Sequence, residues 1–153
     1  MKLLALDIGN SRIHAALFRN GRRLRLCEGP PWPEADVVAA ATVRPSVRLP
    51  RGTRILTRHF PPLVRNRTRS PETVGPDRLA AASAAYFYEK GPCVAVTVGT
   101  ALTVSVINGK GEFVGGLIGP GMKTQAKSLR KNTALLPEVS PRRCKSIVGK
   151  STP

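Results

Sequence analysis

Residues 3–18, LLALDIGNSRIHAALF, predict two apolar strands joined by a short polar turn. The turn, residues 7–11, contains one carboxylate, one glycine and two side chains that can donate hydrogen bonds. A glycine lets backbone N–H groups approach a phosphate closely, Asn10 and Ser11 can donate to its oxygens, and Asp7 can hold a hydrated Mg²⁺. Plain structural hairpins share this composition. The residues alone therefore leave both interpretations open.

Residues 95–108, AVTVGTALTVSVIN, repeat the pattern of an apolar strand, a glycine turn and a β-branched strand. At an offset of 90 residues Gly9 coincides with Gly99. Asp7 falls on Thr97, so the second copy lacks the carboxylate. Two copies of one hairpin predict two related half-domains with a nucleotide between them. We place these halves at residues 1–91 and 92–153.

The composition is that of a globular protein, with 41% hydrophobic and 22% charged residues. No apolar run reaches the roughly 20 residues that a membrane span needs, and no signal peptide is indicated. We therefore expect a cytoplasmic protein with no membrane partner. Cys27, Cys93 and Cys144 are odd in number and unclustered, which favours reduced thiols over a disulfide framework or a metal site.

The formal net charge of +16 raises the question of a polyanionic partner. The basic residues are scattered, and no usual nucleic-acid-binding motif is present. The densest run, residues 51–69, contains only Phe60 as an aromatic side chain on which a base could stack. We therefore favour a solvated basic surface over a nucleic-acid partner.

Patterning along the chain predicts strands and two helices. The first half has expected strands at residues 3–7, 13–19, 22–27, 35–43 and 53–57, the fourth of them parallel and covered on both faces. A loop without a helix follows at 58–75. The second half has expected strands at 93–98, 101–107 and 112–118 and a helix at 122–131, and a further element begins at 146–153. Two Asn-Gly pairs, 20–21 and 108–109, are typical of two-residue hairpin turns.

An alanine-rich helix is expected at residues 77–88, ended by Lys90-Gly91-Pro92. Asp77 occupies the position where a helix N-cap is expected, so its simplest role is to cap this helix. Glycines at 115, 116, 119 and 121 precede the second helix and either receive an anion at its N-terminus or form tight turns. His14 is interpreted as a strand residue rather than a catalyst.

Six motifs in order resemble the type III pantothenate kinases, members of the acetate and sugar kinase, Hsp70 and actin superfamily. They are DIGNSR at 7–12, GPDR at 75–78, VGTALT at 98–103, GGLIGPGM at 115–122, TALLPEV at 133–139 and GKST at 149–152. The resemblance implies an α/β fold of duplicated ribonuclease H-like half-domains, as in actin-like ATPases. Because family members continue well beyond the last motif, we expect the second half-domain to be incomplete.

The resemblance implies ATP- and Mg²⁺-dependent transfer of a phosphoryl group to the primary hydroxyl of pantothenate, an early step of coenzyme A biosynthesis, in a homodimer. Asp77 would be the general base and Arg78 would contact the substrate. The other substrate-binding positions would be Gly75, Pro76 and Thr152. The ATP-binding positions would be Asp7, Ile8, Gly9, Asn10, Ser11, Arg12, Ile13, His14 and Thr100, with Asp7 also the candidate Mg²⁺ ligand.

Three positions depart from the family pattern. Thr97 stands where the family has an Asp that binds an activating monovalent cation, K⁺ or NH₄⁺, which puts that site in doubt. Ser105 replaces a nearby acidic residue, and Thr68 falls where a substrate-contacting Tyr is expected. A catalytically silent nucleotide-binding module or regulator descended from the family is therefore the alternative to an active kinase.

Overall fold

The structure is a computed structural model that describes residues 1–44 and 46–140. Thr152 and the element expected at 146–153 lie outside the described residues. The elements, in chain order, are β1 (Lys2–Ile8), β2 (Ile13–Arg19), β3 (Arg22–Glu28), β4 (Val37–Thr42), β5 (Arg54–Ile55), β6 (Arg65–Asn66), the 3₁₀ turn η1 (Pro71–Thr73), α1 (Pro76–Glu89), β7 (Cys93–Val98), β8 (Ala101–Ile107), β9 (Glu112–Pro120) and α2 (Met122–Asn132).

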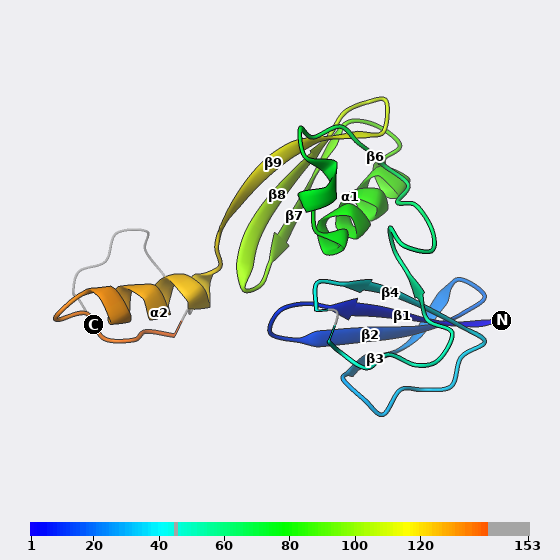
Figure 1. Cartoon of the computed structure of the whole chain (residues 1–153), viewed down its shortest axis with the longest axis horizontal. Helices are drawn as coiled ribbons and strands as arrows, with labels where there is room; N and C mark the ends of the chain where they lie inside the picture. The colour runs from blue at the N-terminus through cyan, green and yellow to red at the C-terminus, as the bar shows by residue number, and fades with distance from the viewer. Residues whose placement is uncertain (45, 141–153) are drawn as a thin grey trace.

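The architecture is mixed α/β, as predicted, with two separate sheets (Figure 1). The first sheet has the order β3-β2-β1-β4-β5, in which β1, β2 and β3 form an antiparallel meander. β4 runs parallel to β1, which confirms the parallel strand expected from its continuous apolar run. Leu4, Leu6 and Ile8 of β1 alternate into the core of this sheet together with Ala15 and Ala40.

The second sheet has the order β6-β9-β8-β7 and repeats the antiparallel meander in β7, β8 and β9. Helix α1 covers one face of it, where Leu79 and Ala82 pack with Ile107 and Phe113. α1 also contacts β4, so this helix lies between the two sheets (Figure 1). α2 follows β9 and extends away from both sheets.

One of the two Asn-Gly predictions is confirmed and the other is wrong. Asn20 and Gly21 both have positive φ, 49° and 79°, in the two-residue turn between β2 and β3. The turn between β8 and β9 is four residues long instead, and its left-handed residue is Gly111, with φ of 71°. The Asn108 side chain accepts hydrogen bonds from the backbone N–H groups of Lys110 and Glu112, which stabilises this wider turn.

The ends of α1 differ from prediction. The helix begins at Pro76 with Gly75 as N-cap, so Asp77 is inside the first turn and its side chain makes no capping hydrogen bond. Proline at the first position explains the earlier start, because its missing N–H costs nothing there. At the other end Lys90, with φ of 52°, takes the left-handed position expected for Gly91. The capping role predicted for Asp77 is therefore wrong.

Two further differences are small. The segment expected to lack a helix contains the single turn η1 and the short strand β6, which pairs in parallel with β9.

Of the helices that the structure describes, none combines the length and apolarity that a bilayer span requires. Cys27 and Cys93, the two cysteines within the described residues, form no disulfide there.

Candidate active site

The two glycine turns predicted from the internal repeat meet in space. The Ser11 Oγ atom of the β1–β2 turn and the Thr100 Oγ1 atom of the β7–β8 turn share a hydrogen bond of 2.6 Å. Both side chains are exposed to solvent. Turns from the two sheets are thus adjacent at one place on the molecular surface, as a site between two halves requires.

The β1–β2 turn presents several unused hydrogen-bond donors. It is closed by a 3.0 Å hydrogen bond from the Gly9 N–H to the carbonyl oxygen of Arg12. Among the described residues, the backbone N–H groups of Asn10, Ser11 and Arg12 donate to no backbone or side-chain acceptor. Consecutive free N–H groups in a turn are suited to binding the oxygens of a phosphate. The donor set of this turn therefore fits a nucleotide phosphate.

The start of α2 holds the β7–β8 turn in place. The Thr100 carbonyl oxygen accepts hydrogen bonds from the Gly121 N–H at 2.9 Å and the Thr124 hydroxyl at 2.7 Å. A Cβ atom on Gly121 would overlap the carbonyl oxygen of Gly99, so only glycine permits this approach. Gly121 thus serves close contact between two backbone segments, a role that was not among the two expected for the glycines before α2. Thr124, which is half-buried, was not predicted from sequence, because a single threonine in a helix gives no local signal of such a contact.

Asp7 and Asp77 lie close enough for their charges to interact. Asp7 is the second-last residue of β1 and lies directly opposite His14 on β2. Asp77 is in the first turn of α1. Desolvation raises the pKa of Asp7 and the nearby Asp77 carboxylate raises it further, whereas His14 lowers it. Water still reaches one side of Asp7, so this desolvation comes from the groups around its inner side.

This pair of carboxylates fits a divalent cation, which would relieve their repulsion. The described residues contain no group of three or more His, Cys, Asp or Glu side chains arranged for a metal. That is compatible with Mg²⁺, which typically takes one or two protein carboxylates and completes its shell with water and phosphate oxygens.

Arg78, next to Asp77, is anchored on the second sheet. Its Nε donates to the Ser105 hydroxyl at 3.4 Å and one terminal nitrogen donates to the Val104 carbonyl at 3.3 Å. The guanidinium also lies over the Phe113 ring, 5.3 Å from the ring centre. These contacts fix the guanidinium on the second sheet, one residue after Asp77 in the chain.

The chain is similar to a family of known proteins. A family model described as type III pantothenate kinase matches residues 52–153, two thirds of the chain. The chain belongs to the type III pantothenate kinase family.

Curated type III pantothenate kinases are similar over about half of the chain. One from Janthinobacterium sp. is 50% identical over 78 residues, which are 50% of this chain and 30% of that protein. One from Akkermansia muciniphila is 43% identical over 82 residues, 54% of this chain and 34% of that protein. One from Rhodococcus erythropolis is 41% identical over 83 residues, which are 54% of this chain and 31% of that protein. The matched stretch thus spans about a third of these relatives' length.

A solved structure is similar over more of the chain. It is a conserved protein from Campylobacter jejuni described as a candidate Baf family transcriptional activator, with a TM-score of 0.60 and 19% sequence identity. The match covers 92% of this chain and 68% of that one. At this identity the likeness supports the fold alone.

The remaining residues expected to bind ATP or substrate differ in which of their atoms a ligand could reach. Ile8 is fully buried and Ile13 is half-buried in the first core, so any contact they make with a nucleotide uses their backbone. His14 is exposed, with its Nδ1 3.9 Å from the Glu28 carboxylate. At the start of α1, a Cβ atom on Gly75 would overlap the Asp77 carboxylate, so glycine leaves room for that side chain.

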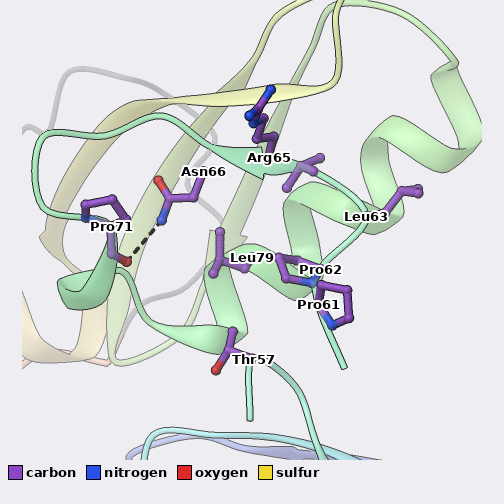
Figure 2. Close-up of a pocket in the computed structure, with 9 residues that line it drawn as sticks. Thr57, Pro61, Pro62, Leu63, Arg65, Asn66, Pro71 and Leu79 are labelled. Atoms are coloured by element: carbon purple, nitrogen blue, oxygen red, sulfur yellow. Dashed lines mark hydrogen bonds between the residues drawn. The ribbon is translucent and has the colours of Figure 1, made fainter. Parts of the chain in front are cut away.

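One pocket among the described residues is lined by none of these groups. It has a volume of about 420 Å³ and is lined by Thr57, Pro61, Pro62, Leu63, Val64, Arg65, Asn66, Pro71 and Leu79 (Figure 2). The Asn66 side chain donates to the Pro71 carbonyl within it. No carboxylate lines it, so it offers no general base and we do not assign the active site to it.

Proposed function

We propose that this chain carries the nucleotide-binding and phosphoryl-acceptor site of a pantothenate kinase, which transfers the γ-phosphate of ATP to pantothenate to give 4'-phosphopantothenate. One observation carries the proposal: the Ser11 and Thr100 turns meet, and beside them Asp77 lies near enough to Asp7 for the two charges to interact. Family membership supplies the reaction, and this arrangement supplies the groups that it needs.

The free N–H groups of residues 10–12 and the Ser11 and Thr100 hydroxyls would hold the ATP phosphates. Asp7 would hold Mg²⁺, which when bound neutralises charge on the phosphates. Phosphoryl transfer depends mainly on alignment and on charge neutralisation. The two turns would therefore supply most of the protein groups that bind and align the nucleotide phosphates.

Asp77 would accept the proton of the pantothenate primary hydroxyl as its oxygen attacks the γ-phosphorus. A carboxylate with no capping hydrogen bond keeps its lone pairs free for this proton. Arg78 would pair with the pantothenate carboxylate, and its anchors on Ser105 and Val104 would set the distance between that carboxylate and Asp77. Gly75 and Pro76 would shape this end of the helix, and Thr152 would add a substrate contact.

We also propose the duplicated ribonuclease H-like fold, with halves at residues 1–91 and 92–153. The β3-β2-β1-β4-β5 order and the second meander in β7–β9 support it. α1 shares its core with the second sheet, so this helix would connect the halves. From the family we further propose a cytoplasmic homodimer as the active form.

The test is formation of 4'-phosphopantothenate from ATP, Mg²⁺ and pantothenate, followed by mass spectrometry, with ATP binding followed by calorimetry. Asp77→Asn should lower turnover by about 10²–10⁴-fold and leave ATP affinity nearly unchanged. Glu89→Gln, an exposed carboxylate at the far end of the same helix, is the matched control and should have no effect. ATP binding without turnover in the unaltered chain would instead favour the catalytically silent module.

A further inference from the structure

The second glycine turn is preceded by a pair of hydroxyls where the family resemblance implies a cation site. Thr97 of β7 lies directly opposite Thr103 of β8, and their Oγ1 atoms share a hydrogen bond of 2.7 Å. Thr97 occupies the position of the family's monovalent-cation ligand. Whether K⁺ or NH₄⁺ fits here depends on the charge and the free oxygens that these residues and their neighbours offer.

The hydroxyl pair is a poor ligand set for a cation. Neither threonine carries a charge, and each hydroxyl already has the other as its partner. The number of charged ligands sets much of a site's affinity for a hard cation, so replacing a carboxylate by a hydroxyl weakens such a site. The Thr103 side chain is buried, with 7% of its surface exposed, so it cannot readily turn away from Thr97.

Ser105, the next residue on the same face of β8 as Thr103, is also a poor ligand for a monovalent cation. Ser105, which replaces the family's second acidic position, is 1% exposed and accepts a hydrogen bond from Arg78 Nε. The Val104 carbonyl, a further oxygen that could serve a cation, accepts from the same guanidinium. The charged group held against these oxygens is therefore itself a cation, which repels K⁺ and NH₄⁺.

We infer that the hydrogen bond between Thr97 and Thr103 takes the place of a bound monovalent cation, so that this chain binds ATP without K⁺ or NH₄⁺. The bond links β7 to β8 three residues before Thr100, the turn residue that contacts Ser11. A direct link between the strands can hold that turn without an ion. The statement about ATP rests on the proposed function, whereas the statement about the cation does not.

The cation is tested on the ligand-free chain by thermal unfolding. Melting temperatures are compared in KCl, NH₄Cl and tetramethylammonium chloride at one ionic strength. The unaltered chain should melt at the same temperature in all three salts, and a specific increase in KCl or NH₄Cl would overturn the inference. Thr97→Asp should acquire that increase, because it restores a carboxylate at this position, and Thr97→Asn, of nearly equal size but neutral, should not.

A Thr97→Asp chain that folds and remains indifferent to K⁺ would also contradict the inference, since residue 97 would then not decide cation binding. If this variant does not fold, the unaltered chain still decides between the two results. In the second arm, the Kd for ATP of the unaltered chain should agree within about twofold between KCl and tetramethylammonium chloride. A K⁺ requirement there overturns the inference, whereas failure to bind ATP in any salt contradicts the proposed function and leaves the melting result standing.

Discussion

The hydroxyl oxygens of Ser11 and Thr100 lie 2.6 Å apart although 89 residues separate them along the chain. This contact joins the turns of two different sheets. If both hydroxyls face the nucleotide phosphates, removing either one leaves the other without its partner and the phosphate with one donor fewer.

We expect Ser11→Ala and Thr100→Val each to weaken ATP binding by about tenfold, close to the 1.4 kcal/mol of one good hydrogen bond. The double variant should lose less than the sum of the two, because the residues share one interaction. Calorimetric titration with ATP measures all three, and Ser70→Ala in the exposed loop before η1 is the control. Strict additivity would show that the two hydroxyls act independently.

Gly121→Ala tests the contact between α2 and the β7–β8 turn. The added methyl group would overlap the Gly99 carbonyl oxygen and lie 3.0 Å from that of Thr100, so the turn must move. We expect ATP affinity to fall by at least about tenfold, because the phosphate donors are misplaced. Gly119→Ala, two residues earlier, would meet no atom within 4 Å and should bind ATP normally. Equal affinities for the two variants would contradict this role for Gly121.

Asp7→Asn should change stability in a pH-dependent way in the ligand-free chain. The folded state raises the pKa of Asp7, so its charged form is disfavoured by folding. This cost is absent below the ordinary pKa of the unfolded chain, 3.8, and is fully present above the folded-state pKa. The variant should therefore melt at a higher temperature than the unaltered chain at pH 7. The increase should be no more than about 2 °C, because solvent screens a partly exposed group. At pH 3 the two proteins should melt at the same temperature.

Mg²⁺ provides the functional side of the same experiment. Addition of Mg²⁺ with ATP should stabilise the unaltered chain and have much less effect on Asp7→Asn, because the carboxylate that would hold the ion is gone. Scanning calorimetry from pH 3 to pH 8, with and without Mg²⁺ and ATP, measures both effects. A lower melting temperature for the variant at pH 7 would show that the Asp7 charge stabilises the fold.

Arg78→Lys should raise the KM for pantothenate by about tenfold to a hundredfold with little change in the KM for ATP. A lysine ammonium cannot reproduce the planar contacts with Ser105, Val104 and the Phe113 ring, nor a two-bond pairing with a carboxylate. Ser105→Ala removes one anchor and should have a smaller effect in the same direction. Steady-state kinetics with each substrate varied separately gives the answer, and an equal rise in both KM values would point to general misfolding.

Local patterns were sufficient to predict most of the secondary structure. Alternation of apolar residues, β-branched runs and the Asn20-Gly21 pair act over a few residues, so the boundaries of β2, β7 and β8 agree with expectation. The secondary-structure predictions were wrong where a second local interaction favoured a different conformation. The Asn108 side chain stabilised a wider turn than its Asn-Gly pair predicts, and Pro76 moved the start of α1 ahead of Asp77.

The amino-acid sequence by itself determined the two hairpin meanders and the motifs of the kinase family, because strand patterning and turn chemistry depend on near neighbours. Only the tertiary structure decided which groups come together: Ser11 bonds to Thr100, Arg78 bonds to Ser105, and Asp77 lies near enough to Asp7 for the two charges to interact. Each of these pairs joins segments from different elements, and their approach depends on how α1 packs between the two sheets and how Gly121 admits the neighbouring backbone. Such contacts depend on side-chain packing across the whole fold, which no short stretch of sequence contains.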